Sequence, residues 1–238
     1  MRGGILSAGL LFPRRTGREQ VGPDQRSPWQ AGRWNPEDFA REQIRGLVRQ
    51  IFFSNVEKPV RQVVFSTLEP QTDVWNICRR VGEALAMETE QSIAVVGAHP
   101  HILPDAETDP EMPEETGTNG STARKQGATR VRSNLWLVSP AEKHRDRVTT
   151  TFWHSYLGEM RREFGYSIVE GPPAKYSNET TAMAQFADGI VLVLSAHRTR
   201  RVMARKVKET LEGAQARIFG VLLIDRVFPI PEGIYRRL

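Results

Sequence analysis

Short apolar runs alternate with longer amphipathic stretches over most of the chain. Several runs, such as "SIAVVGA" and "GIVLVLSA", are continuously apolar, which is typical of strands buried on both faces of a parallel sheet. The predicted strands lie at 61–67, 92–98, 134–140, 166–173, 189–196 and 216–224. The predicted helices lie at 36–53, 73–88, 141–164, 178–187 and 199–214. This alternation predicts an α/β fold with a doubly wound, mainly parallel sheet and helices on both faces.

Two segments interrupt the alternation. Residues 1–36 are rich in Gly, Pro and Arg without a sustained period, and we expect a flexible N-terminal arm. Residues 101–133 contain many Pro, Asp, Glu, Thr and Gly and few apolar positions, so we expect a disordered insertion there. The remainder of 37–238 is predicted to form one α/β domain.

The overall composition favours a cytoplasmic protein with an anionic neighbour. The 238 residues carry a net charge of +5 and contain one cysteine, Cys78, which excludes an internal disulfide framework and fits a reducing compartment. No apolar run reaches the roughly 18 residues that a membrane helix needs. The pair His99 and His101 has no third ligand nearby, so we expect no metal site.

In a doubly wound sheet, ligands bind beyond the carboxyl ends of the strands. The first predicted strand is followed by "PQTDVWN", in which Thr72 or Asp73 suits the N-cap of the next helix. A helix N-terminus attracts anions. If Asp73 is the cap, its carboxylate occupies the position that a phosphate would take, and the helix start is an ordinary capped one.

Five blocks in the same order resemble the bacterial tyrosine kinases of capsular and exopolysaccharide biosynthesis. They read "EQIRGLVRQIFFS", "FGYSIVEGPPA", "FADGIVLVLSAHRTRR", "LEGAQARIFGVLL" and "PIPEGIYRRL". These kinases belong to the P-loop superfamily that includes the MinD and ParA ATPases. The resemblance covers residues 37–238 apart from 101–133, and it implies a three-layer fold like that of the P-loop NTPases.

The nucleotide loop of this family is degenerate in the chain. Relatives carry a Gly-rich loop that ends in Gly-Lys-Ser/Thr. In this chain Thr72 precedes the last positions of that loop. Asp73 aligns with the glycine, Val74 with the lysine, and Trp75 and Asn76 with the two hydroxyl residues. In such loops glycines let amides approach the phosphates, the lysine supplies positive charge, and a hydroxyl ligates Mg²⁺. Valine and tryptophan supply none of these interactions.

The acidic motifs of the family are altered as well. Relatives have two aspartates after the next strand, at the positions of Gly97 and His99, and a third aspartate at the position of Glu170. Glu170 keeps a carboxylate on a longer side chain, as a remnant acidic position. We therefore expect no catalytic residue and no bound cofactor; the alternative is an atypical Mg·ATP site in which Glu170 holds the metal.

Two further segments suggest interactions with partners. Glu42 and Arg45 match a Glu-x-x-Arg-x-x-Arg segment through which related kinases form rings, but the second arginine position is Val48. The alternative is a surface ion pair one helical turn apart. A basic helix carries Arg198, Arg200, Arg201 and Arg205. It suits either solvent or an anionic membrane or acidic segment, whereas nucleic acid is disfavoured because aromatic residues are not interleaved.

Together these features predict a non-catalytic pseudo-kinase that acts as a scaffold or regulator of exopolysaccharide synthesis or export. The resemblance implies a cytoplasmic protein peripheral to the inner membrane, with the cytoplasmic segment of a membrane polysaccharide co-polymerase as partner and homo-oligomers through the first helix. One alternative is an active tyrosine autokinase or ATPase. Another is a positioning protein like MinD or ParA, bound to membrane or DNA.

Overall fold

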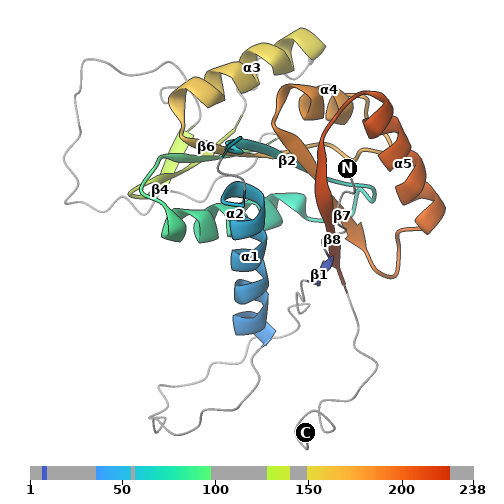
Figure 1. Ribbon diagram of the computed structural model, residues 1–238, viewed down its shortest axis with the longest axis horizontal. Coiled ribbons are helices and arrows are strands. Elements are labelled where there is room, and N and C mark those ends of the chain that lie inside the picture. The colour runs from blue at the N-terminus through green and yellow to red at the C-terminus, as the bar shows by residue number, and fades with distance from the viewer. Residues whose placement is uncertain (1–6, 10–35, 55–56, 98–127, 140–148, 226–238) are drawn as a thin grey trace, which may run out of the picture.

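The computed structural model describes residues 7–9, 36–54, 57–97, 128–139 and 149–225. Within these ranges the chain alternates strands and helices, as Figure 1 shows. In chain order the elements are β1 (Ser7–Gly9), α1 (Pro36–Phe52), β2 (Gln62–Thr67), α2 (Val74–Glu88), β3 (Ile93–Val96), β4 (Ala128–Arg132), β5 (Leu135–Val138), α3 (Thr150–Glu163), β6 (Tyr166–Glu170), α4 (Glu179–Phe186), β7 (Gly189–Ser195), α5 (Arg201–Gly213) and β8 (Ile218–Ile224).

The strands form one eight-stranded sheet in the order β1-β8-β7-β2-β6-β3-β5-β4. All neighbouring strands are parallel except β4 and β5, which are antiparallel at one edge. β2 lies between β6 and β7, and its register pairs Phe65 with Glu170 and Thr67 with Val193. The carboxyl ends of these three strands therefore meet at the same edge of the sheet.

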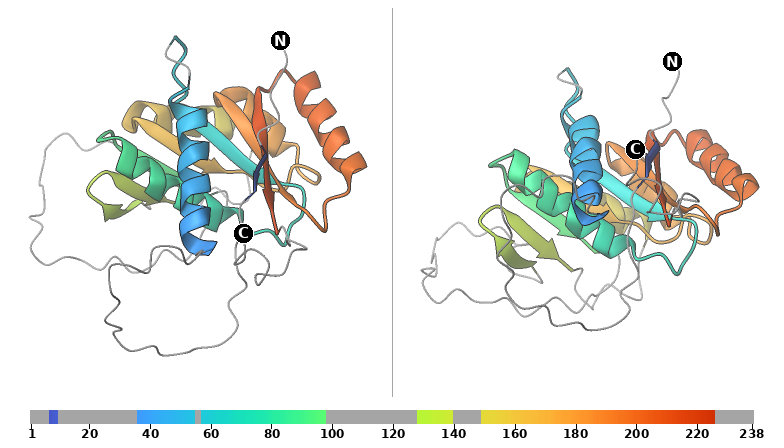
Figure 2. Two further views of the ribbon diagram at one scale, coloured as in Figure 1. Left: turned by 60° about the horizontal axis from the view of Figure 1, so that its bottom comes forward. Right: turned by 90° about the horizontal axis from the view of Figure 1, so that it is seen from below.

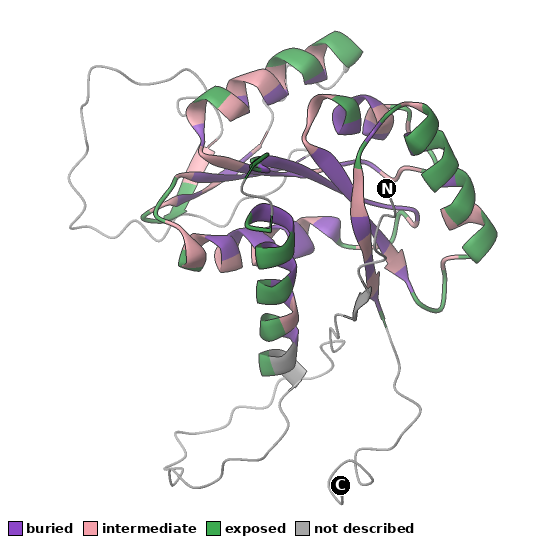
Figure 3. Cartoon of the chain, in the orientation of Figure 1, coloured by how far each residue is buried: buried purple, intermediate pink, exposed green. Residues whose placement is uncertain are grey.

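Two hydrophobic cores cover the two faces of the sheet. Side chains alternate along β2, so Val63 and Phe65 join the core under α1 and α2, whereas Val64 joins the core under α3, α4 and α5. Figure 2 shows these helices on opposite sides of the sheet, and Figure 3 shows buried strands beneath helices with exposed outer faces. The predicted fold class, a doubly wound α/β sheet with helices on both faces, is confirmed.

The structure differs from the sequence prediction in two elements. The helix predicted from residue 141 begins at Thr150, because Thr149 is extended and its Oγ1 accepts a hydrogen bond from the Phe152 amide at 3.2 Å. Residues Ala128–Arg132 form β4 inside the segment predicted to be a disordered insertion. Their side chains are mostly exposed, so backbone pairing with β5 forms this strand without the apolar pattern of a buried one.

The predicted domain boundaries stay predictions. Three residues of the predicted arm, Ser7–Gly9, pair with β8 at the edge of the sheet. The rest of residues 1–35 and most of the predicted insertion, residues 101–127, lie outside the described residues.

Candidate functional site

The loop that follows β2 is a short turn which leads directly into α2. The Glu69 amide donates to Thr67 Oγ1 at 3.1 Å, and the Thr72 amide donates to the Glu69 carbonyl at 3.1 Å. α2 begins at Val74. The backbone of this loop is therefore arranged around its own hydrogen bonds.

Asp73 is the N-cap of α2. Its Oδ1 accepts a hydrogen bond from the Asn76 amide at 2.9 Å. Asp73 is thus the capping residue of the two that the sequence offered, and Thr72 is not. The carboxylate satisfies one of the free amides at the positive end of the helix, where an anion would otherwise bind.

The next two side chains point to the protein interior. Val74 is 3% exposed and belongs to the core under α1 and α2. Trp75 is half-buried and packs against the same core. The position that the resemblance aligns with the phosphate-binding lysine is therefore a core position in this chain.

The turn after β6 approaches the β2 backbone closely. The Gly171 amide donates to the Phe65 carbonyl at 2.8 Å, and a Cβ at Gly171 would lie 3.0 Å from Val64 Cγ1. Ser66 Oγ and Thr180 Oγ1 both donate to the Pro172 carbonyl at 2.6 Å. These bonds hold the turn beside the β2 loop. No local sequence pattern marks Thr180, because its partner is a backbone carbonyl outside its own helix.

The pKa of the buried Cys78 thiol reflects the burial and the charges of this region. Burial raises the pKa of its thiol well above the usual value, and the carboxylates of Glu170 and then Asp73 raise it further. Glu170, at the end of β6, and Asp73, at the start of α2, thus both influence the same buried thiol. The Asp73 carboxylate at the start of α2 disfavours a phosphate there.

Of the remaining predicted acidic-motif positions, the structure describes Gly97. Gly97 is buried, and its amide donates to the Val138 carbonyl at 2.9 Å. His99 and His101 lie outside the described residues. In the part of the chain that the structure describes, no three His, Cys, Asp or Glu side chains are grouped so that they could hold a metal ion.

The basic segment after β7 starts at the same sheet edge. Ser195 Oγ donates to Asp225 Oδ2 at 2.9 Å, and the Thr199 amide donates to the Ser195 carbonyl at 3.0 Å. Asp225 has a positive φ of 56°. No local sequence pattern marks this residue as functional, since its partner Ser195 is remote in sequence. The turn presents exposed arginines at positions 198, 200 and 201. Arg205, further along α5, is also exposed but pairs with Glu209 at 3.3 Å.

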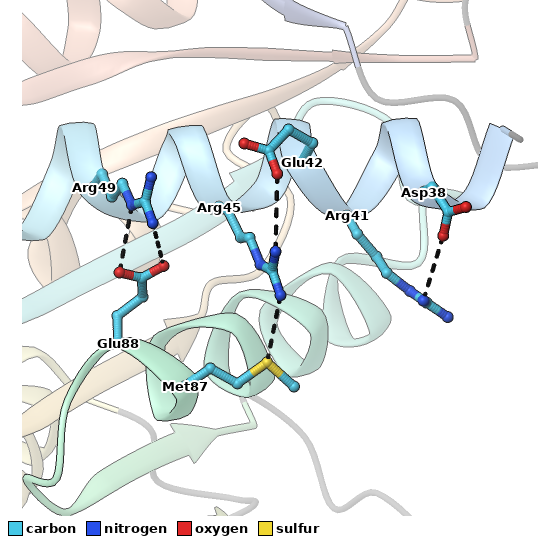
Figure 4. Close-up of polar contacts among 7 residues, drawn as sticks. All are labelled: Asp38, Arg41, Glu42, Arg45, Arg49, Met87 and Glu88. Carbon is cyan, nitrogen blue, oxygen red and sulfur yellow. Dashed lines mark hydrogen bonds and ion pairs between the residues drawn. The ribbon is translucent and has the colours of Figure 1, made fainter. Parts of the chain in front are cut away.

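Of the predicted interaction residues on α1, Arg45 extends toward α2 and Glu42 meets Arg45 on the same helix (Figure 4). Arg45 Nη1 lies 3.9 Å from Glu42 Oε2, which is the ion pair one helical turn apart that the sequence allowed. Arg45 Nη2 also lies 4.0 Å from Met87 Sδ. Both charged side chains are substantially exposed, at 45% and 67%, so they are accessible at the surface.

The second arginine of the ring-forming segment has no equivalent in this chain. Val48 is fully buried in the core. The adjacent Arg49 is exposed, but it binds both carboxylate oxygens of Glu88 on α2, at 2.9 and 3.3 Å. The hydrogen bond to Glu88 raises the pKa of Arg49. The side chain that could replace the missing arginine is therefore already paired within the protein.

The chain shares sequence similarity with a bacterial tyrosine kinase. It is 29% identical over 91 residues to tyrosine-protein kinase CpsD of Streptococcus agalactiae, and the match spans 37% of this chain and 40% of the relative. The matched part is thus less than half of the curated relative. No protein-family model matches the chain.

The fold is also that of known kinase domains. The kinase domain of Escherichia coli tyrosine kinase ETK superposes with a TM-score of 0.62 at 14% identity, over 91% of this chain and 88% of that domain. The chimerical protein CapA2B2 superposes with a TM-score of 0.59 at 19% identity, over 79% and 85% of the chains. A ParA family ATPase from Chlorobium tepidum gives a TM-score of 0.50 at 14% identity, over 71% and 75%.

None of the helices in the described ranges combines the length and apolar character needed to cross a membrane. The resemblance expected from the five sequence blocks is confirmed in two ways: the chain is similar in sequence to the tyrosine kinase CpsD, and its fold is that of bacterial tyrosine kinase domains and of the MinD and ParA ATPases.

Proposed function

We propose that the protein is a non-catalytic relative of the polysaccharide-biosynthesis tyrosine kinases and acts as a scaffold or regulator of exopolysaccharide synthesis or export. The observation that carries the proposal is the start of α2. Asp73 caps the helix, and Val74, at the lysine position, is buried in the core. At this position a nucleotide would meet a carboxylate, whereas the related kinases present a positively charged loop lined with backbone amides.

The chemistry of phosphoryl transfer supports this proposal. Catalysis of this reaction rests on positioning and on neutralising the charge of the transferred phosphoryl group. Here the Asp73 carboxylate caps the α2 start, so the charge at this position is negative, whereas neutralisation of the phosphoryl group requires positive charge. The residues present do not fit Mg·ATP, so no catalytic step is assigned to them.

The proposed partner is the cytoplasmic segment of a membrane polysaccharide co-polymerase, with the protein peripheral to the inner membrane. Two surfaces are available for such contacts. The exposed Glu42–Arg45 pair lies on α1, and the cations after β7 lie at the sheet edge. Self-assembly through α1 is a further proposal, in which Arg45 contributes without the second arginine.

Calorimetric titration of the purified full chain with Mg·ATP tests the loss of nucleotide binding. We expect no saturable heat and no rise in melting temperature, whereas an active CpsD kinase run in parallel gives both. Saturable binding with a Kd below about 100 μM would overturn the proposal. In that case Glu170→Gln identifies the alternative site, because a Mg²⁺ ligand lost there abolishes the heat.

A complementation experiment tests the scaffold role separately. In a strain that lacks the gene, the wild-type chain and the Glu170→Gln variant should restore the amount and length of the polysaccharide equally. Restoration by the wild type alone, with the variant folded and present at equal level, would show that a carboxylate at this position is needed and would contradict a purely structural role.

A further inference from the structure

Exposed apolar and positively charged side chains lie together at the carboxyl edge of the sheet. Tyr176 is 64% exposed and Val202 is 76% exposed, the two highest values among the large hydrophobic side chains of the described residues. We call the following group the edge patch: Lys175, Tyr176, Arg198, Arg200, Arg201 and Val202. All six side chains are exposed.

Backbone hydrogen bonds bring the two halves of the edge patch together. The Ala174 amide donates to the Thr67 carbonyl at the end of β2 at 2.8 Å. Thr67 is in register with Val193 of β7, and Ser195 ends that strand two residues later. Lys175 and Tyr176 therefore lie next to the turn that leads into α5, although they follow a different strand.

The charges of the edge patch are close to each other and positive. Lys175 Nζ donates to the Tyr176 hydroxyl at 2.8 Å and lies 4.6 Å from the centre of its ring. This hydrogen bond raises the pKa of Lys175, the Glu69 carboxylate raises it to a smaller extent, and the nearby Arg200 charge acts to lower it. Arg200 is thus near enough to Lys175 for its charge to affect the pKa of that amine.

The arginines of the edge patch differ in their pairing from the cations further along α5. Arg205 and Lys208, further along α5, pair with Glu209 and Glu212 at 3.3 and 2.9 Å. Within the described part of the chain, by contrast, no ion pair involves the arginines at positions 198, 200 and 201. Their positive charge is available to an external anion.

The turn that carries these arginines is held in place. The Ser195 amide donates to Thr199 Oγ1 at 3.1 Å, and the Thr199 amide returns a bond to the Ser195 carbonyl at 3.0 Å. Ser195 Oγ is bound to Asp225 at the end of β8. Less conformational entropy is then lost when the cations meet a partner.

We propose that the edge patch binds the surface of a bilayer that contains anionic phospholipid. Lipid headgroups supply the negative charge, and the interfacial region accepts an amphipathic tyrosine and an apolar side chain. An acidic peptide would match the charge but gives no reason for an exposed Val202. A nucleic acid is a poorer match, because a single tyrosine cannot stack successive bases. This inference rests on the proposed function, because it specifies which surface holds the protein at the inner membrane.

Vesicle flotation of the full chain tests the edge patch. Vesicles of phosphatidylcholine with about 30% phosphatidylglycerol should retain the protein at low salt, and pure phosphatidylcholine vesicles should not. The triple variant R198Q/R200Q/R201Q should partition about 100-fold more weakly, because each cation near an anionic surface contributes roughly a fivefold factor. Tyr176→Ser and Val202→Ser should each weaken retention by a few-fold.

A matched variant, K58Q/R132Q/R162Q, removes the same charge from exposed positions on other parts of the molecule and should bind like the wild type. Equal losses in the two triple variants, equal binding to both vesicle types, or binding to neither would overturn the proposal. The proposal would also be overturned if an acidic peptide displaced the protein from the vesicles while the Tyr176→Ser and Val202→Ser variants bound the vesicles like the wild type. The Mg·ATP titration is a separate measurement on the same protein, so failure of one proposal is distinguishable from failure of the other.

Discussion

Two helices begin at the same edge of the sheet with opposite electrostatic surroundings. α2 starts with the Asp73 cap, a buried Val74 and the nearby Glu170 carboxylate. α5 has Arg200 as its N-cap residue, without a capping side-chain hydrogen bond, and Val202 is exposed. By the proposed correspondence, the negatively surrounded start is the one that matches the nucleotide loop of the related kinases, and the positive charge lies at the other start. The contrast teaches that two helix starts at one edge of a sheet can differ in chemistry.

Matched valine-to-lysine substitutions give the largest expected difference between the two helix starts. Val74→Lys puts a charge into the core and should lower the free energy of unfolding by about 3 kcal/mol. Val202→Lys on α5 adds a charge to an exposed position and should change it by less than about 0.5 kcal/mol. Urea unfolding monitored by circular dichroism measures both. A stable Val74→Lys protein that binds Mg·ATP would contradict the contrast.

The pH dependence of stability reports the burial and negative field beneath α2. The native Cys78 thiol keeps its proton at pH values where the unfolded thiol, with an ordinary pKa near 9.0, loses it. Stability from this group is therefore complete below pH 9.0 and falls as the pH rises toward the native pKa, by up to about 1.4 kcal/mol per pH unit.

Urea unfolding of the wild type and Cys78→Ala between pH 7 and pH 10 checks this expectation. The wild type should lose stability more steeply above pH 9 than the variant does. Parallel pH curves for the wild type and Cys78→Ala would show that the thiol titrates alike in both states.

Removal of the α2 cap should have a smaller effect. Asp73→Ala loses the hydrogen bond to the Asn76 amide and should cost about 1 kcal/mol of stability, while Asp73→Asn keeps an acceptor and should cost less. Thermal unfolding at neutral pH measures the difference. If both variants are as stable as the wild type, capping by Asp73 is not what the helix start requires.

Addition of a cap to α5 should have the smallest effect. Arg200 has extended backbone angles, φ −74° and ψ 130°, which suit an N-cap serine. Arg200→Ser should therefore raise stability by about 0.5 kcal/mol while it weakens retention on anionic vesicles. Arg200→Gln is the control, because it removes the same charge without adding a good capping group. A gain in lipid binding with Arg200→Ser would contradict the assignment of this surface.

The local pattern of the chain predicted most of the fold. Continuous apolar runs such as β7 can be stable when both faces are buried, and this fact requires a sheet with helices on both sides. The sequence pattern did not predict β4. This strand is stabilised by pairing with β5, and no residue pattern within Ala128–Arg132 encodes that contact. In the same way α3 begins later than predicted, because Thr149 forms a local cap that competes with the apolar period.

The sequence by itself determined the residue types in the turn after β2 and offered Asp73 as a cap. The tertiary structure decided that Val74 faces the core, that Glu170 acts on the same buried thiol as Asp73, and that Arg49 is paired with Glu88. It also placed Lys175 beside the turn before α5. These relations join residues on different strands and helices, and they depend on strand order and register, which local propensities leave open.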